Sequence, residues 1–202
     1  MVLSDTAIRN RLATGSIKIS HMNCPYAIEP ASVDIWLGNT FAVPDYERIA
    51  RNGACVSLET KLPYTHYAIN MDSHVDKLKN FVLEPKSFVL ATTLEYVEIP
   101  NDLAARIDGR SSIGRSGLFI QNAGWIDPGF CGEITLELFN ALNVPILLTP
   151  GRRIGQLIFH SMEGEVENPY NGKYQGQKGA TESKIYQDAD IKAGDGNECE
   201  SA

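Results

Sequence analysis

The sequence predicts a mainly β protein, an antiparallel sandwich or barrel preceded by one short helix. Short segments in which apolar and polar residues alternate recur along the chain, and they are punctuated by prolines and glycines such as Pro100 and Pro150-Gly151. Hydrophobic residues make up 43% of the 202 residues and charged residues 21%, which is enough apolar content for a buried core. We therefore expect one domain, or one domain with a tail.

A short helix is expected near the N-terminus. Ser4 suits the N-cap position, and Asp5 suits the first turn. Ile8 and Leu12 are four residues apart, so they share one helical face. Gly15 is a typical residue at which such a helix ends.

Alternating apolar residues predict the strands. In residues 31–39, Val33, Ile35 and Leu37 lie on one face, and Gly38-Asn39 is expected to end the strand. Residues 60–80 have no clear pattern, apart from a brief helical segment at 72–80. Further strands are expected at residues 87–92, 94–99, 134–139, 144–149 and 154–159.

Net charge and hydropathy exclude several classes of protein. The formal net charge of −7 argues against nucleic-acid binding through bulk electrostatics. No run of 18 apolar residues occurs, so no membrane span is expected. The N-terminus lacks the apolar core of a signal peptide, so we expect a cytoplasmic protein. The last 17 residues hold five acidic residues and one lysine, so we expect a domain at 1–185 and an acidic, disordered tail at 186–202.

The cysteine pattern does not support a zinc site. Cys24, Cys55, Cys131 and Cys199 are widely scattered, and they form no C-x-x-C pair. No H-x-E sequence precedes such a pair, so the signature of the zinc-dependent nucleobase deaminases is also lacking. Reduced and mostly buried thiols are the plain interpretation.

The densest polar cluster lies at residues 108–117. Two arginines, three serines and three glycines fall within these ten residues. Guanidinium groups match phosphate oxygens in pairs, hydroxyls add donors, and glycines let main-chain N–H groups approach an anion closely. The cluster therefore suits a polyphosphate, but its composition suits a surface turn with ordinary salt bridges equally well.

Two carboxylates are candidates for chemistry. Asp127 precedes a Pro-Gly turn, so it either caps that turn or holds a sugar hydroxyl or a water molecule. Glu137 lies in an apolar strand, on the same face as Thr135 and Phe139 and opposite Ile134, Leu136 and Leu138. It is either an exposed strand residue or a pocket residue whose pKa is raised by partial desolvation, and such a carboxyl can take a proton from water and return it to a leaving amine.

Residues 168–179 are rich in glycine, with lysines and tyrosines interleaved. Such a segment can act as a lid, whose cations close over phosphates and whose aromatic ring covers a base. Its position near the C-terminus favours a mobile tail as the alternative.

Taken together, these segments resemble the dCTP deaminase branch of the trimeric dUTPase superfamily. The resemblance runs from residue 3 to residue 184, and it favours the functional interpretation of each segment. It rests on five blocks in the same order, at residues 31–38, 109–118, 124–130 with 136–138, 151–158 and 173–181.

The resemblance implies a distorted β-barrel or jelly-roll protomer and a homotrimer with three sites between subunits. It also implies dCTP or dUTP bound as a magnesium complex through the triphosphate, without zinc. The matched catalytic residues are Glu137, Ser111, Arg115 and Asp127. The matched substrate-binding residues are Arg110, Ser111, Ser112, Ile113, Gly114, Arg115, Ala123, Asp127, Thr135, Leu136, Glu137, Gln156, Tyr170, Lys173 and Gln177.

The resemblance also assigns roles to these positions. Glu137 would deprotonate a water that attacks C4 of the cytosine and would then protonate the departing ammonia. Ser111, Arg115 and the main chain around Ala123 would hold that water and the developing charge. Asp127 matches the residue that holds the deoxyribose 3′-hydroxyl. Gln156, Tyr170, Lys173 and Gln177 match the triphosphate and lid contacts.

The same scaffold hosts three activities, so the fold alone does not choose among them. Glu137 disfavours a plain dUTPase, because those enzymes carry an apolar residue there. Gly124-Trp125 stands where monofunctional deaminases usually carry a His-Arg pair, and it resembles the bifunctional, dUMP-forming enzymes. Glycine at this place leaves room near Asp127 for a second water, aimed at the α-phosphate.

Two alternatives and one regulatory expectation remain. The first alternative is a monofunctional dCTP deaminase that releases dUTP, and the less favoured second is a regulatory binding protein on the same fold. Feedback inhibition by dTTP is expected from the family. The loop linked to it departs from the usual pattern, because Asn122 stands in place of a threonine and the loop is one residue shorter.

Overall fold

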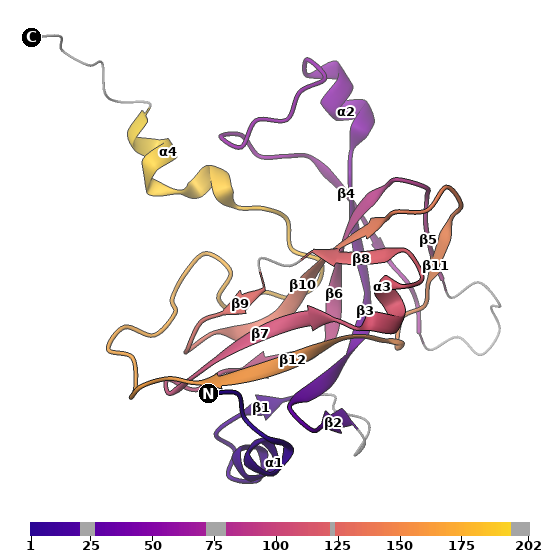
Figure 1. Ribbon diagram of the computed structural model, residues 1–202. Helices are drawn as coiled ribbons and strands as arrows, with labels where there is room; N and C mark the ends of the chain where they lie inside the picture. Colours follow the sequence, from indigo (N-terminus) through magenta and orange to yellow (C-terminus); the bar gives the residue numbers. More distant parts are fainter. Residues whose placement is uncertain (21–26, 72–79, 122–123, 195–202) are drawn as a thin grey trace, which may run out of the picture.

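The computed structural model of the chain describes residues 1–20, 27–71, 80–121 and 124–194. Strands dominate the described chain, and they are joined by a few short helices (Figure 1). In chain order the elements are α1 (Asp5–Ala13), β1 (Lys18–Ile19), β2 (Ile28–Glu29), β3 (Ser32–Pro44), α2 (Tyr46–Arg51), β4 (Tyr64–Ala68), β5 (Phe81–Leu83), β6 (Phe88–Glu98), β7 (Leu103–Gly109), α3 (Ser111–Gly114), β8 (Leu118–Gln121), β9 (Trp125–Ile126), β10 (Cys131–Asn140), β11 (Ile146–Leu148), β12 (Arg153–Ser161), η2 (Ile185–Gln187) and α4 (Ala189–Gly194).

Strand β3 joins the two parts of a curled ten-stranded sheet (Figure 1). Its first half pairs with β12, where Val33 lies opposite Leu157. Its second half pairs with β6 and β4, where Phe41 lies opposite Ala91 and Tyr67. The sheet order is β8-β10-β6-β3-β12-β7-β9, and β5 and β11 form a separate pair. These pairings are antiparallel, which confirms the predicted mainly β, antiparallel class.

The expected end of the first strand at Gly38 is wrong, because β3 continues to Pro44. A Cβ atom on Gly38 would lie 2.5 Å from Thr92 Cγ2 and 2.9 Å from the carbonyl oxygen of Thr93. The register between β3 and β6 also shifts between Leu37 and Phe41. Position 38 therefore requires glycine, because β3 and β6 approach each other too closely there for a Cβ atom. This is the place where β3 passes from one part of the sheet to the other.

The two strands expected at 87–92 and 94–99 form one continuous strand, β6. At the expected break, Thr93 is buried, and its hydroxyl donates to the carbonyl of Glu95 and accepts from the main-chain N–H of Ile134. The neighbouring strand β10 is irregular between Glu133 and Thr135. The hydroxyl therefore takes the place of a main-chain partner, and β6 passes the irregularity without interruption.

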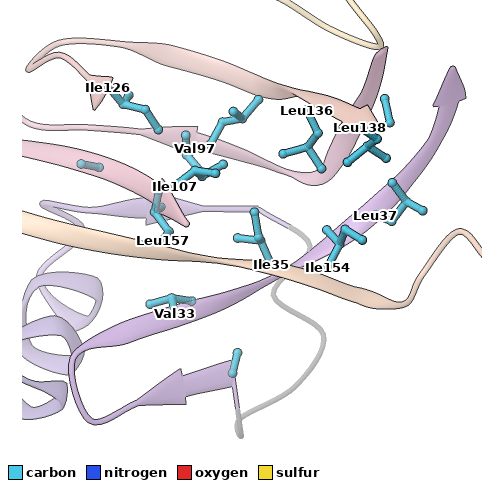
Figure 2. Close-up of a cluster of buried hydrophobic side chains, with 14 of the residues drawn as sticks. Val33, Ile35, Leu37, Val97, Ile107, Ile126, Leu136, Leu138, Ile154 and Leu157 are labelled. Atoms are coloured by element: carbon cyan, nitrogen blue, oxygen red, sulfur yellow. The ribbon is translucent and has the colours of Figure 1, made fainter. Parts of the chain in front are cut away.

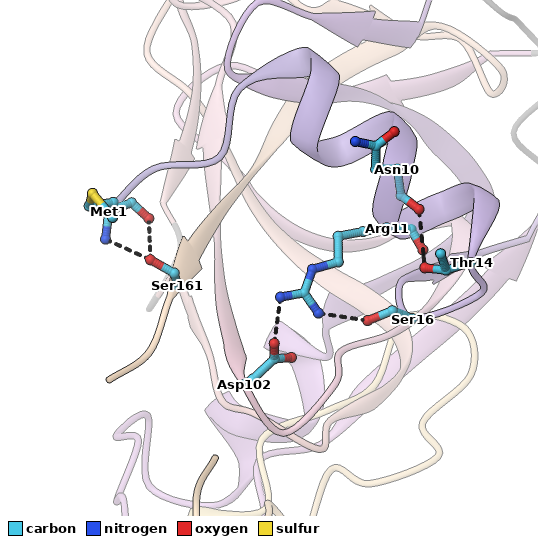
Figure 3. Close-up of polar contacts among 7 residues, drawn as sticks. All are labelled: Met1, Asn10, Arg11, Thr14, Ser16, Asp102 and Ser161. Atoms are coloured by element: carbon cyan, nitrogen blue, oxygen red, sulfur yellow. Dashed lines mark hydrogen bonds and ion pairs between the residues drawn. The ribbon is translucent and has the colours of Figure 1, made fainter. Parts of the chain in front are cut away.

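The predicted N-terminal helix is confirmed as α1. The Ser4 hydroxyl caps it by accepting from the N–H of Ala7, and Gly15 follows it with a φ of 71°. Ile8 is fully buried. Arg11 joins the helix to the rest of the chain, because its guanidinium pairs with the Asp102 carboxylate at 2.5 Å and donates to Ser16 (Figure 3).

The main core lies between the two parts of the sheet. Figure 2 shows Val33, Ile35 and Leu37 of β3 beside side chains of β12 and β10. Strand β10 alternates strictly, with Ile134, Leu136 and Leu138 buried and the residues between them partly exposed, as predicted. This alternation places Thr135 and Glu137 on the face away from the core.

The chain beyond residue 183 carries helical turns as far as Gly194. Apart from Ile185, they fall within residues 186–202, the segment expected to be a disordered tail, and Figure 1 shows α4 lying away from the sheet. The Lys173 ammonium pairs with the Asp188 carboxylate in this region. The remainder of the tail, 195–202, and the helical segment expected at 72–80, apart from its last residue, lie outside the described residues. None of the described helices is long and apolar enough to cross a membrane.

Candidate functional site

A cavity of about 500 Å³ opens beside the outward face of β10. It is enclosed by β10 with its neighbour β6, by the segment around β9 with Ile107 of β7, by the loop before β4 with Tyr64, and by the C-terminal segment. Several candidates lie together in its wall, namely Gly124, Trp125, Asp127, Thr135, Glu137, Tyr170 and Gln177.

Glu137 lies in the cavity wall because β10 alternates. Its two neighbours in sequence, Leu136 and Leu138, are fully buried in the core, so its own side chain points the other way. Burial raises the pKa of the Glu137 carboxyl above its ordinary value. No described residue forms a hydrogen bond with this carboxyl. A partly desolvated carboxyl of this kind binds a proton more readily than an exposed one, which suits a group that accepts and returns a proton.

Tyr64 faces the same cavity from the start of β4. Burial, and then the negative charges of Glu182 and Glu137, raise the pKa of its phenol to about 12. The phenol therefore keeps its proton and remains a hydrogen-bond donor beside two carboxylates. Sequence reasoning missed Tyr64, because it lies in the region without a clear pattern and is placed by its pairing with Pro44.

Asp127 follows β9 at a tight turn that contains Pro128-Gly129. The turn is closed by the main chain, since the carbonyl of Asp127 accepts from the N–H of Phe130 at 3.2 Å. No described residue forms a hydrogen bond with the Asp127 carboxylate, which is exposed to the cavity. The turn-capping alternative is therefore disfavoured for this side chain.

Gly124 and Trp125 lie next to Asp127 in the cavity wall. The carbonyl of Gly124 accepts from the N–H of Ile107, and Trp125 pairs with Arg106 of β7. The Trp125 side chain is 53% exposed, and its ring lies 5.6 Å from the ring of His160. Gly124 thus presents no side chain to the cavity, whereas Trp125 and Asp127, which follow it, do.

The C-terminal segment folds back over the cavity. The N–H of Tyr170 donates to the carbonyl of Pro128 at 2.8 Å, and its ring lies 5.8 Å from that of Phe130. Gln177 also lines the cavity, whereas Lys173 does not. The Asp188 carboxylate raises the pKa of Lys173 through a hydrogen bond. Tyr170 and Gln177 therefore lie in the cavity wall, and Lys173 lies apart from them.

Glu182 closes one side of the cavity and was not singled out from the sequence. Its carboxylate pairs with His66 of β4 at 2.8 Å and with Lys61 at 3.2 Å. Burial acts to raise the pKa of Glu182, but the hydrogen bonds with His66 and Lys61 outweigh it and lower the pKa. The only sequence signal was its position directly after the last matched block, residues 173–181.

The serine–arginine cluster lies elsewhere in the chain. Ser111–Gly114 form the single turn α3, which Arg110 caps at the end of β7. Arg110 and Arg153 both pair with the buried Asp34 carboxylate, at 3.4 Å and 2.8 Å. None of the following candidates lines the cavity: Arg110, Ser111, Ser112, Ile113, Gly114, Arg115, Gln156 and Leu136.

Gln156, Leu136 and Ala123 were also expected to contact the substrate. Gln156 lies on β12 opposite Asp34, and its side chain accepts from the Ser32 hydroxyl at 3.3 Å. The Leu136 side chain is fully buried in the core, so it does not reach the cavity. Ala123 and the neighbouring Asn122 lie outside the described residues. A single chain therefore brings together only part of the predicted site.

The described cysteines are free. Cys55 is exposed and Cys131 is partly buried, so neither of these two thiols is fully buried, in contrast to the general interpretation of mostly buried thiols. Cys24 and Cys199 lie outside the described residues. Within the part of the chain that the structure describes, no group of three or more His, Cys, Asp or Glu residues is arranged to hold a metal ion.

The chain is similar to known proteins along almost its whole length. A relative from Sulfurihydrogenibium sp. (strain YO3AOP1), named dCTP deaminase, dUMP-forming, is 44% identical over 191 residues, which cover 94% of this chain and 100% of the relative. A second, from Natronomonas pharaonis and named dCTP deaminase, is 41% identical over 197 residues, which cover 95% of this chain and 98% of the relative.

The fold is also found in a solved structure. The crystal structure of 2′-deoxycytidine 5′-triphosphate deaminase from Agrobacterium tumefaciens matches with a TM-score of 0.56 and 23% identity, covering 78% of this chain and 48% of that one. A family model described as dCTP deaminase-like matches residues 2–162. Since that match spans most of the sequence and the relatives align along almost its whole length, the chain belongs to the dCTP deaminase-like family.

Proposed function

We propose that this chain converts dCTP into dUMP, ammonia and diphosphate. The observation that carries the proposal is the common cavity of Glu137, Asp127 and Gly124-Trp125. It is supported by the 44% identity to a relative whose name includes dUMP-forming. Deamination needs a proton-transferring group, and hydrolysis needs a second water beside the sugar phosphate, and this cavity offers a place for each.

Glu137 is the proposed general base and acid of the deamination. Its carboxylate takes a proton from a water whose oxygen bonds to C4 of the cytosine, and C4 becomes tetrahedral. The same carboxyl then returns the proton to the amino group, so that the C4–N bond breaks and ammonia leaves. The raised pKa of Glu137 suits both halves of this task.

We assign the serine–arginine cluster to the same site through a homotrimer. Arg110, Ser111 and Arg115 lie outside the cavity of their own chain. In the proposed trimer, the α3 region of one subunit completes the cavity of the next. Ser111, Arg115 and the main chain around Ala123 then hold the attacking water and the developing charge, and Arg110, Ser112 and Gly114 bind phosphate oxygens.

Asp127 is proposed to hold the deoxyribose 3′-hydroxyl and to orient a second water toward the α-phosphate. Gly124 leaves room for that water because it has no side chain. Tyr170, Lys173, Gln177 and Gln156 are proposed to contact the triphosphate or to cover it. The oxygens of a triphosphate fit magnesium, which would enter with the substrate and polarise the phosphorus–oxygen bonds. The same site would take dTTP as a feedback inhibitor.

A product analysis tests the proposal. Incubation of the protein with dCTP and magnesium, with dCTP, dUTP, dUMP and diphosphate resolved over time, is expected to yield dUMP and diphosphate in equal amounts. The 41% identity to a relative named simply dCTP deaminase favours a second candidate, a deaminase that releases dUTP. Accumulation of dUTP alone would establish that candidate, and the role given to Gly124-Trp125 would then fail.

A further inference from the structure

Residues 177–181 of the C-terminal segment are tied to the sheet by a continuous set of hydrogen bonds. The side chain of Gln177 donates to the carbonyl of Glu133 at 2.8 Å, and the N–H of Glu133 donates to the carbonyl of Gln177 at 3.0 Å. The N–H of Ala180 donates to the Thr40 hydroxyl at 3.0 Å. The N–H of Thr181 donates to the Thr135 hydroxyl at 3.2 Å.

Glu133 makes the largest share of these contacts. Besides its two main-chain bonds to Gln177, its carboxylate accepts from the N–H of Gly179 at 2.6 Å and from the Thr92 hydroxyl at 3.4 Å. A carboxylate acceptor makes a shorter and stronger hydrogen bond than a neutral one. Gly179 has a φ of 69°, so the chain turns at the residue that Glu133 holds.

The turn at Gly179 determines which residues of the C-terminal segment face the cavity. Gln177, Thr181, Glu182 and Ser183 flank Gly179 on both sides, and all four line the cavity. Ala180, directly after the turn, is 6% exposed, so this short stretch is packed against the sheet. The bond between Glu133 and Gly179 therefore lies between two groups of cavity residues without itself lining the cavity.

We infer that Glu133 is a positioning residue, which holds the turn at Gly179 against β10 and thereby keeps the C-terminal wall of the substrate cavity in place. The inference rests on the proposed function, since it assigns the wall to dCTP binding. Glu133 touches no reacting atom, and it acts through residues 177–183.

This role has a distinct kinetic signature. If only the docked segment forms the binding site, the apparent affinity for dCTP falls with the fraction of chains in which it is docked. Bound substrate favours the docked state, so saturating dCTP restores it. Loss of the Glu133 carboxylate is therefore expected to raise KM while kcat changes little.

Limited proteolysis measures, in the absence of substrate, how firmly the turn at Gly179 is docked on the sheet. Lys178 is exposed and lies directly before Gly179, so trypsin cleaves there once the turn leaves the sheet. A hydrogen bond to a charged group is worth enough that Glu133→Ala is expected to accelerate cleavage at Lys178 by roughly tenfold or more. KM for dCTP is expected to rise by a similar factor. Glu133→Gln keeps an acceptor oxygen and is expected to stay within about threefold of the wild-type protein in both measurements.

Glu98→Ala is the matched control. It removes the same charge from the neighbouring strand, where Glu98 pairs with Lys18, and it is expected to leave both measurements unchanged. Threonine is favoured in strands, and its side chain is too short to reach Gly179. Glu133→Thr therefore replaces Glu133→Ala if the latter does not fold.

The results distinguish failure of the role inferred for Glu133 from failure of the proposed function. Equal cleavage rates at Lys178 for the wild-type protein and a folded Glu133→Ala or Glu133→Thr variant would overturn the inference. A fall in kcat with unchanged KM would also overturn it, because the residue would then act on the chemistry. Faster cleavage in a protein that does not turn over dCTP would leave Glu133 as the anchor of the turn and would overturn the proposed function alone.

Discussion

The position of Glu137 depends on which of its two faces β10 turns toward the core. Leu136 and Leu138 occupy the buried face, so Glu137 is carried on the other face into a cavity that partly desolvates it. The same alternation is visible in the sequence. What the sequence leaves open is whether the second face meets solvent or a cavity, because that depends on β4 and on residues 170–183, which are distant along the chain.

Glu137→Gln is expected to keep dCTP binding and to lose deamination by about 10³-fold or more, because glutamine keeps the shape but cannot transfer the proton. Ammonia release and equilibrium binding of dCTP, measured on the same preparation, check this. Glu163→Gln, which changes an exposed residue after β12, serves as the control. Near wild-type ammonia release from Glu137→Gln would remove this residue from the mechanism.

Glu95 is a buried carboxyl with no role in the proposed mechanism. Its side chain is 1% exposed, Oε2 accepts from the main-chain N–H of Trp36 at 3.1 Å, and Oε1 has no partner among the described residues. Burial raises its pKa from 4.5 to about 7, against a smaller lowering by the bond from Trp36. The folded state therefore holds a proton on Glu95 that the unfolded state releases between these two values.

Glu95 is expected to make the folded protein less stable as the pH rises. Because the folded protein binds more protons than the unfolded protein between pH 4.5 and 7, Glu95 lowers the free energy of unfolding as the pH rises through this range, by about 3 kcal/mol in all. Urea unfolding of Glu95→Gln at pH 5 and pH 8 is expected to lack this loss, whereas Glu98→Gln is expected to retain it. Parallel pH profiles for the wild-type protein and Glu95→Gln would refute the assignment.

At the scale of elements, long-range pairing decides where strands begin and end. Strand β3 passes through Gly38-Asn39, which is a typical stop signal, because β6 receives the glycine in a close crossing. Strand β6 runs through the boundary expected near Thr93 because that hydroxyl bonds across to β10. In β7, β8 and β4 the local pattern was too weak for prediction, and pairing with β12, β10 and β3 forms them.

Gly38→Ala is expected to lower the free energy of unfolding by about 2 kcal/mol or more. The new methyl group would meet the Thr92 side chain at 2.5 Å and the main-chain oxygen of Thr93 at 2.9 Å, so β3 and β6 would have to separate. Urea unfolding measures the change. Gly114→Ala is the control, since a Cβ there meets nothing within 4 Å. Equal midpoints for the two variants would contradict the close crossing.

At the scale of the whole molecule, the candidate residues form two groups. Glu137, Asp127 and Thr135 line the cavity, whereas Arg110, Ser111 and Arg115 lie at α3, beyond the far end of β7. The proposed homotrimer, with its sites between subunits, would bring the two groups together, because symmetry repeats each contact around the ring.

Subunit mixing tests this arrangement. Arg115→Ala and Glu137→Gln are each expected to be inactive as pure proteins, whereas trimers refolded from an equal mixture should regain about a quarter of the wild-type activity, since random association restores one site in four. The deaminase rate of the refolded mixture provides the measurement, with each variant refolded alone as the control. A mixture no more active than the two variants would place both residues in the site of one chain.

The amino-acid sequence alone determined the fold class, the N-terminal helix with its Ser4 cap and the two faces of β10. These features depend on neighbours a few positions apart, so local sequence carries them. The tertiary structure decided that Asp127 and Glu137 share a cavity, that Tyr64 and Glu182 join them, and that Glu133 holds the turn at Gly179. Those contacts join segments far apart along the chain, and only the packing of the folded sheet brings them together.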